Sequence, residues 1–492
     1  MYVLAIDQST SGTKAIIFDE KGGIVHRVTV YHKQYYPKPG WVEHDPEEIF
    51  RNTLDACRKV IEESGIKPLE IEALAITNQR ETTILWEKKS GKPVYNAVVW
   101  QCQRGASLCE EIKKRGLEGK IKEKTGLVVD PYFSASKIRW ILDNVEGVKN
   151  KAKQGEIAFG TVDSWLIWKL TKGEVHATDF SNASRTLLLN IHELRWDEEV
   201  LEIFEIPPEI LPELKSSDSV FGYTDLGFLP KKIPIVGVMG DSSAALFGQG
   251  GFYSGDIKVT YGTGSSTMLN IGEKPNVSDS PIVCSVGWVV KETSSYVLEG
   301  NIHSAGDTIV WLKEKLGIIS DPSETEKIAL SLENNGGVYL VPAFVGLGAP
   351  YWRSDVKAAI LGLQRNHGKE HVVRAALESI AYQVRDIFEE MVRISSKEPT
   401  EVRADGGITR NRFLMQFQAD ILNIPVLVSN IEEVSARGVA FVALLHLGAF
   451  SDLEEIRQKI TYREKYEPRM GDELREMYYE GWKTAIRKLL TE

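Results

Sequence analysis

Cysteine is scarce in this sequence of 492 residues, and long apolar runs are missing. No apolar stretch approaches the ~20 residues that a helix needs to cross a bilayer. The first residues, from Met1 to Asp7, carry no basic region and no cleavage site. The four cysteines form no Cys-x-x-Cys pair and are too few for a disulfide scaffold, so we expect free thiols. These cysteines are Cys57, Cys102, Cys109 and Cys284. The absences together predict a cytoplasmic protein with no membrane insertion.

An excess of positive charge is also missing. The formal net charge is −10, and recognition of a phosphate backbone needs clustered lysine and arginine, so no nucleic-acid partner is expected. Hydrophobic residues make up 42% and charged residues 26% of the chain, as in ordinary globular proteins. The length allows roughly two to four domains. Because no Pro-, Gly- or Ser-rich linker is present, we expect the domains to pack directly against one another.

Two similar strand patterns divide the chain into halves. Apolar segments over residues 3–6, 14–18 and 24–30 are separated by short polar turns, which predicts a three-stranded meander. Past the midpoint, residues 256–261 and 267–271 form a second strand–turn–strand unit. We interpret this repetition as an internal duplication. It predicts an N-terminal domain over residues 1–248 and a C-terminal domain over residues 249–492.

Helical periodicity appears between the strand patterns. Apolar residues recur at helical spacing over residues 371–394, and residues 439–447 are apolar on every side, which predicts a buried helix. The fold class is therefore α/β, with both parallel and antiparallel strands.

The polar turn at residues 7–14, called the first turn below, is a candidate phosphate site. Its backbone N–H groups and hydroxyls suit an anion, Asp7 suits a magnesium ion, and Lys14 suits a phosphate. The alternative is a plain hairpin turn. A second turn, Tyr261 to Ser265, is its counterpart in the other half, and two such turns facing each other would clamp a triphosphate. Neither is a Walker A loop.

Three further segments place polar residues at strand ends. Asp241 stands between an apolar strand and an apolar helix, either as a catalytic acid or as a helix N-cap. The glycine pair within residues 404–411 suits close approach of a flat ligand, or is an ordinary strand-to-helix turn. Arg80 and Glu81 follow a buried strand, where they suit hydroxyl recognition or form a surface ion pair.

Several longer segments resemble the glycerol kinases of the FGGY carbohydrate-kinase family. The resemblance covers essentially the whole chain. It is carried by residues 7–14, 78–83, 96–102, 131–144, 240–249 and 358–378. It implies two actin-like (ribonuclease H-like) domains with ATP and substrate in a cleft between them. It also implies transfer of phosphate to a primary hydroxyl of a small polyol or sugar, most simply glycerol, and a homodimer or homotetramer.

The resemblance further implies roles for individual residues. Asp241 matches the general base of the family, which takes the proton of the attacking hydroxyl. The polyol pocket would comprise Arg80, Glu81, Trp100 and Tyr132. ATP would contact Thr10, Ser11, Gly12, Lys14, Thr263, Gly306, Gly407 and Asn411, with Mg²⁺ near Asp7. Lys14 stands where the family commonly has arginine.

Two departures from the family pattern fall in the expected substrate pocket. Ser242 replaces a glutamine, and Ser266 replaces an aromatic residue that packs on glycerol. Either glycerol remains the substrate, or the smaller side chains admit a polyol or ketose of four or five carbons. Loss of one apolar wall shifts discrimination by roughly 1–3 kcal/mol. A third alternative is a non-catalytic actin-like ATPase, which has no need of a polyol pocket.

Overall fold

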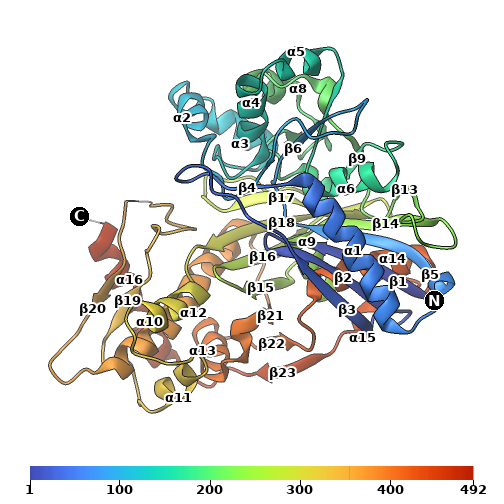
Figure 1. The fold of residues 1–492 in the computed structure, drawn as a ribbon. Coiled ribbons are helices and arrows are strands. Elements are labelled where there is room, and N and C mark those ends of the chain that lie inside the picture. The colour runs from blue at the N-terminus through green and yellow to red at the C-terminus, as the bar shows by residue number, and fades with distance from the viewer. Residues whose placement is uncertain (354, 491–492) are drawn as a thin grey trace.

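The computed structural model describes residues 1–353 and 355–490 and contains two large sheets (Figure 1). In the first sheet the predicted meander is confirmed, because β1, β2 and β3 are antiparallel neighbours. Strands β5 and β14 extend it in parallel beyond β1, and β13 closes the edge antiparallel to β14. Their bounds are β1 (Tyr2–Gln8), β2 (Gly12–Asp19), β3 (Ile24–Tyr31), β5 (Ile71–Asn78), β13 (Val220–Thr224) and β14 (Ile233–Gly240).

The second sheet repeats this topology. Strands β18, β16 and β15 form the antiparallel meander, β21 and β22 extend it in parallel, and β23 closes it antiparallel. An extra strand, β17, pairs with β18. The bounds are β15 (Ile257–Tyr261), β16 (Ser265–Gly272), β17 (Val283–Val290), β18 (Thr293–Ile302), β21 (Val402–Asp405), β22 (Val426–Ser429) and β23 (Tyr462–Tyr466). The repeated strand order confirms the predicted internal duplication.

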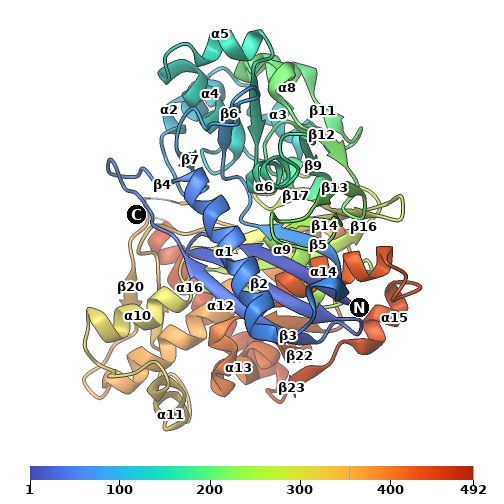
Figure 2. The same ribbon diagram turned by 45° about the vertical axis from the view of Figure 1, so that its right-hand side comes forward.

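Two helices cover opposite faces of the first sheet. Helix α1 (Pro46–Ser64) packs against β2 and β3, in front of them in Figure 2. Helix α14 (Val434–His446) packs against β1, β5 and β14 on the other face. Its burial confirms what the apolar sequence of residues 439–447 predicted, which did not specify the surface it packs on. A helix from the second half of the chain therefore completes the core of the first sheet.

Helix α9 (Asp241–Gly248) crosses α14 at two glycines. A Cβ on Gly248 would lie 2.0 Å from the Val434 carbonyl oxygen, and one on Gly438 would lie 2.0 Å from that of Ala244. No larger residue fits at this crossing, so the two halves are held at backbone contact distance beside the strand end that carries Asp241.

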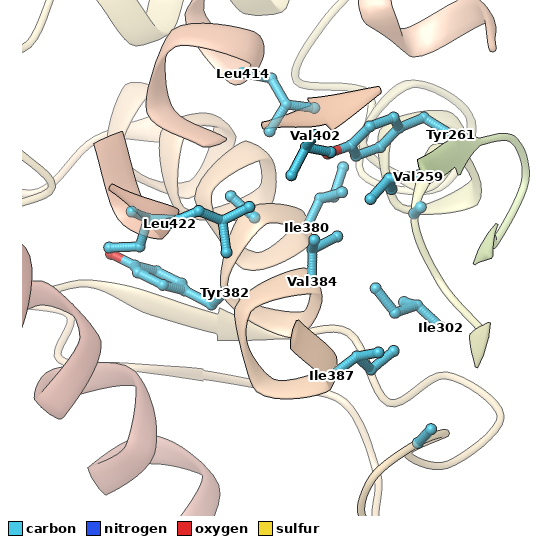
Figure 3. Packing of buried hydrophobic residues seen from close by; sticks show 14 of the residues in the cluster. Val259, Tyr261, Ile302, Ile380, Tyr382, Val384, Ile387, Val402, Leu414 and Leu422 are labelled. Carbon is cyan, nitrogen blue, oxygen red and sulfur yellow. The ribbon is translucent and has the colours of Figure 1, made fainter. Parts of the chain in front are cut away.

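The core of the second half is built on α12 (Lys369–Ser395), which confirms the helix predicted over residues 371–394. Ile380, Val384 and Ile387 face the second sheet, where Val259 and Ile302 lie (Figure 3). Helices α13 (Arg412–Leu422) and α16 (Asp472–Leu490) also pack against α12.

A lobe of short elements lies between β5 and β14 in sequence, at the top of Figure 1. The short strand β4 (Glu43–His44) precedes β5 in the chain but pairs with β7 of this lobe. The other elements are β6 (Ile84–Glu87), β7 (Ala97–Val98), α2 (Ala106–Lys114), α3 (Glu118–Thr125), α4 (Ser134–Asn144), α5 (Val148–Lys153), β8 (Ile157–Gly160), α6 (Val162–Leu170), β9 (Ala177–Asp179), α7 (Phe180–Ala183), β10 (Leu189–Asn190), β11 (Arg195–Trp196), α8 (Glu198–Phe204) and β12 (Glu213–Lys215). The second half adds α10 (Gly306–Glu314), α11 (Glu324–Leu330), β19 (Tyr339–Val341), β20 (Ala359–Leu361) and α15 (Leu453–Lys459).

Among the described helices, none is long and apolar enough to cross a membrane. All four cysteines are free and buried.

Candidate active site

Arg80, Glu81 and Asp241 meet where two neighbouring strands end. Strands β5 and β14 are parallel, with Gly240 paired to Asn78, so the residues that follow both strands emerge at one edge of the sheet. The Arg80 Nε lies 3.2 Å from the Asp241 Oδ1. Arg80 is buried, whereas the Asp241 side chain is 42% exposed and accessible to a substrate. The structure therefore assembles the predicted acid and the predicted hydroxyl-binding pair in one place.

Asp241 is not a helix N-cap. Gly240 occupies the cap position, and Asp241 is the first residue of α9. Its Oδ1 accepts a hydrogen bond from the Ser242 backbone N–H at 2.6 Å. The Gly240 N–H in turn donates to the Ser181 hydroxyl at 2.8 Å, which fixes the backbone just before the carboxylate. Asp241 is thus held through its Oδ1, which contacts both the Ser242 N–H and the Arg80 Nε.

Two buried residues that the sequence analysis missed complete this charge cluster. The two terminal nitrogens of Arg80 donate to the two oxygens of Glu299, at 2.8 and 2.7 Å. The Arg185 Nε donates to Glu81 Oε1 at 2.6 Å, and its Nη1 lies 3.1 Å from Glu299 Oε2. No motif of the sequence pointed to either residue, because they lie far from residues 78–83 in the chain.

Burial and pairing act in opposite directions on these carboxylates. Burial alone would raise the pKa of Glu299, but Arg185 and Arg80 outweigh it and hold that pKa well below its ordinary value. For Glu81, burial wins over Arg185 and Arg80, and the pKa is raised. Glu299 therefore carries a negative charge, whereas Glu81 is the more readily protonated of the two buried carboxylates.

Trp100 and Tyr132, which the family resemblance assigns to the polyol pocket, lie together and form an aromatic wall. Their rings are 5.4 Å apart in an edge-to-face arrangement. The Trp100 Nε1 donates to the Thr10 hydroxyl at 3.0 Å, which ties this wall to the first turn. The Lys137 ammonium, buried in α4, donates to the carbonyl oxygens of residues 131, 132 and 133 and so holds the Tyr132 backbone.

The first turn lies beside the end of β5. The backbone and side-chain N–H groups of Gln79 donate to the backbone and side-chain oxygens of Gln8, at 2.7 and 3.0 Å. Gly12 packs so closely that a Cβ there would lie 2.8 Å from the Val30 carbonyl oxygen, and Ser11 is exposed at the tip. Backbone groups of this turn are therefore fixed relative to Arg80 and open to a ligand.

Lys14 forms an ion pair with a carboxylate of the other half of the chain. Its Nζ donates to Glu433 Oε2 at 2.6 Å. Asp7, paired with Lys14 across β1 and β2, has its pKa raised to about 7 by burial, with Glu433 and Asp241 adding to the effect and Lys14 opposing it. The first turn thus places one cation and one readily protonated carboxyl side by side.

Three of the four predicted nucleotide residues in the second half gather around the second turn. The Gly306 N–H donates to the Gly262 carbonyl at 3.0 Å, and the Thr263 carbonyl accepts from Ala305 at 3.0 Å, so the N-terminus of α10 rests on the turn. Gly407 follows Gly406, which has a φ of 98° and touches Tyr261, and a Cβ on Gly407 would meet nothing within 4 Å. This glycine is open to a flat ligand.

Asn411, for which an ATP contact is predicted, has a structural role in the fold. Its Oδ1 caps α13 by accepting from the Leu414 N–H at 2.9 Å, and its Nδ2 donates to the Thr325 hydroxyl at 3.0 Å. The side chain is therefore held in place by α11 and α13.

The two serines that depart from the family pattern differ in setting. Ser242 follows Asp241 directly in α9 and is half-buried. Ser266 lies on β16 between Thr260 and Asn301, and its hydroxyl is buried with no hydrogen-bond partner in the described part of the chain. An unpartnered buried hydroxyl is costly unless a ligand pairs with it.

No cluster of three or more His, Cys, Asp or Glu residues that could hold a metal ion occurs within residues 1–353 and 355–490. A cation at Asp7 would therefore share its coordination with phosphate oxygens and water. This pattern is the usual one for Mg²⁺ in phosphate-transfer sites.

Two sheets of one topology, with acidic and basic side chains at adjacent strand ends, define an α/β enzyme with the actin-like (ribonuclease H-like) fold. Sequence profiles of the FGGY family of carbohydrate kinases match this chain, the N-terminal domain over residues 2–248 and the C-terminal domain over residues 257–447. The chain therefore belongs to the FGGY family of carbohydrate kinases and is a phosphotransferase.

Individual relatives match over nearly the full length. Glycerol kinase 2 of Thermotoga maritima is 51% identical over 489 residues, which cover 99% of both chains. The glycerol kinase of Caldanaerobacter subterraneus is 50% identical over 489 residues, covering 99% of this chain and 98% of the relative. The crystal structure of Plasmodium falciparum glycerol kinase with ADP superposes with a TM-score of 0.94 at 38% identity, covering 99% and 98% of the two chains.

Proposed function

We propose that this protein transfers the γ-phosphoryl group of ATP to a primary hydroxyl of glycerol, giving glycerol 3-phosphate. The observation that carries the proposal is the accessible Asp241 carboxylate 3.2 Å from Arg80, with Glu81 and the Trp100–Tyr132 wall in the same site. Relatives of about half-identical sequence that carry the name glycerol kinase support it. A filament-forming or chaperone ATPase has no use for this arrangement.

Asp241 is the general base of the proposed reaction. The hydroxyl oxygen attacks the γ-phosphorus as its proton passes to the Asp241 carboxylate, and the bond from phosphorus to the ADP oxygen breaks. Arg80 has N–H groups left to donate to substrate hydroxyls, and Glu81 accepts from them. Trp100 and Tyr132 cover the carbon chain and exclude water from the reacting oxygen.

The two turns are proposed to bind ATP. Backbone N–H groups of Thr10, Ser11 and Gly12, with Lys14, would face the phosphates, and Thr263, Gly306, Gly407 and Asn411 would bind the rest of the nucleotide. Asp7 would hold Mg²⁺, which neutralises phosphate charge when bound. The buried carboxyl beside Lys14 suits this cation, because a hard cation prefers a carboxylate oxygen.

A coupled ADP-release assay over a panel of substrates tests the function. The panel is glycerol, dihydroxyacetone, erythritol, threitol, erythrulose, xylulose and ribulose. We expect the highest kcat/KM with glycerol. A higher kcat/KM for a four- or five-carbon compound would overturn glycerol as the preferred substrate. ADP release that no compound stimulates would overturn the proposed kinase function.

The second candidate is a kinase for a longer polyol or ketose. The buried, unpartnered Ser266 hydroxyl and the small Ser242 side chain favour it, since a longer substrate carries a further hydroxyl that would pair with Ser266. The same panel separates the two candidates.

A further inference from the structure

Glu299 belongs to the second sheet but binds an arginine of the first half of the chain. It lies on β18, where it pairs with Met268 and Val283 of the neighbouring strands. Its side chain is completely buried, and each carboxylate oxygen accepts from a different Arg80 nitrogen. The ion pair therefore crosses from one half of the molecule to the other and shares Arg80 with the Asp241 contact.

The pairing fixes the plane of the Arg80 guanidinium. Arg80 has five N–H groups: two are used by Glu299, and the Nε–H faces Asp241 at 3.2 Å. A bidentate carboxylate pair has a defined geometry, so the two remaining N–H groups point in set directions. A flexible arginine bound at one nitrogen would lack this constraint.

Arg185 links Glu299 to the second hydroxyl-binding residue. Its Nη1 lies 3.1 Å from Glu299, and its Nε donates to Glu81 at 2.6 Å. Glu81 itself has a left-handed backbone, with a φ of 61°, so its side chain is held in a direction that an ordinary helix or strand residue does not take. Glu299 therefore contacts Arg80 directly and is linked to Glu81 through Arg185.

We propose that Glu299 is a positioning residue of the polyol site, which orients Arg80 towards Asp241 from the opposite half of the molecule. The polyol site is then complete only when both halves are in place, and Glu299 couples their relative position to polyol binding. This inference rests on the proposed polyol kinase function.

The competing explanation is that Glu299 only balances charge. Arg80 and Arg185 are both buried and need carboxylates nearby, since an unpaired buried charge is costly. Charge balance requires a negative charge but no particular geometry. Substitution by aspartate separates the two explanations, because it keeps the charge and shortens the side chain by one methylene.

The test is Glu299→Asp in the full-length protein, measured with the best substrate of the panel. We expect KM for the polyol to rise by about tenfold or more, because well-aligned hydrogen bonds to a charged group are lost. KM for MgATP should change less than about twofold, since the nucleotide residues are not touched. Glu299→Gln, which has only one oxygen left to accept from Arg80, loses the two-point geometry and should also raise KM for the polyol.

Glu378→Asp is the matched control. Glu378 is also fully buried and pairs with an arginine, Arg374, at 2.7 Å, but within α12 and outside the site. The Glu378→Asp variant should lower the melting temperature without changing KM for the polyol. Glu299→Asp with wild-type KM for the polyol would overturn the positioning role, and so would an equal rise in both KM values. Wild-type protein that phosphorylates no polyol would instead overturn the proposed function.

Discussion

The Lys14 ammonium lies 2.6 Å from Glu433 Oε2, which joins the first turn to the residue before α14. The other oxygen of Glu433 accepts from Arg27 at 2.8 Å, and only 5% of this side chain is exposed. The positive charge that the sequence predicts for ATP is thus already shared with a carboxylate. Phosphate oxygens entering the first turn have to compete with Glu433 for Lys14.

Glu433→Gln should therefore tighten nucleotide binding. The substitution removes a negative charge beside the proposed phosphate site and leaves Lys14 free to face the phosphates. The Lys14 side chain is 33% exposed, so solvent screens its pair with Glu433 and the pair is worth about 1 kcal/mol or less. We therefore expect KM for MgATP to fall by about threefold to fivefold. Steady-state kinetics at low and high salt measure this, with the larger difference at low salt. Glu432→Gln is the control, because Glu432 is exposed and pairs with Arg27 and Arg410 instead. A higher KM for MgATP in Glu433→Gln would contradict a competition between Glu433 and the phosphates for Lys14.

Asp241→Asn should abolish most of the chemistry and spare binding. Asparagine keeps the size and can still accept from the Ser242 N–H, but it cannot take the hydroxyl proton. We expect kcat to fall by about 10²- to 10⁴-fold, the usual contribution of a general base. Glycerol binding, followed by calorimetry, should change only a few-fold. A variant with near-normal kcat would show that another group takes the proton.

Much of the fold could be predicted because the repeated pattern is local. Alternating strands around tight turns mark β1 to β3 and β15 to β16, and helical periodicity marks α12. The packing of α14 on the first sheet could not be predicted, since an apolar helix shows that it is buried but not against which surface. The structure places it, through the Gly248–Gly438 crossing with α9 and through Gly237 of β14, where a Cβ would lie 2.4 Å from the Val439 carbonyl oxygen.

The candidate site was predictable where its residues follow a strand in a recognisable motif. Arg80, Glu81 and Asp241 are of this kind, and the structure brings them together. Arg185 and Glu299 could not be found in this way, because their role depends on a contact across more than a hundred residues of chain. Lys14 belongs to the first turn, for which the sequence predicts phosphate binding, but its pairing with Glu433 depends on the packing of the two halves.

Lys137→Met should loosen the loop that carries Tyr132. Lys137 donates to three consecutive carbonyl oxygens at residues 131–133, and methionine fills the same volume without donors. Unpaired buried carbonyl groups cost about 1–3 kcal/mol each, partly offset because a buried charge is also removed. We expect KM for the polyol to rise about tenfold, with KM for MgATP unchanged. Unaltered polyol kinetics would contradict a role of Lys137 in holding Tyr132.

The same lysine predicts a pH dependence. Burial lowers the pKa of Lys137 to about 8, from 10.5 in the unfolded chain. Between these two values the unfolded chain binds more protons than the folded protein, so the contribution of Lys137 to the free energy of unfolding increases with pH, by up to ~3 kcal/mol. KM for the polyol should rise over the same range, because the neutral amine has one donor fewer. Urea unfolding from pH 7 to 10 tests the change in the free energy of unfolding, and kinetics over the same range test the rise in KM for the polyol. Lys137→Met is the reference, because it should show neither change. Identical pH profiles for wild type and Lys137→Met would contradict this assignment.

Filling the two serine positions should narrow the range of substrates. Ser242→Gln and Ser266→Phe together place larger side chains beside Asp241 and on β16. A substrate one carbon longer than glycerol then loses space, and each such contact is worth roughly 1–3 kcal/mol of discrimination. We expect kcat/KM for erythritol to fall at least about tenfold relative to that for glycerol, and each single variant to give part of the change. The ratio of the two kcat/KM values in the coupled assay measures this. An unchanged ratio in the double variant would mean that neither serine borders the substrate, and that the size of the polyol is set by other residues.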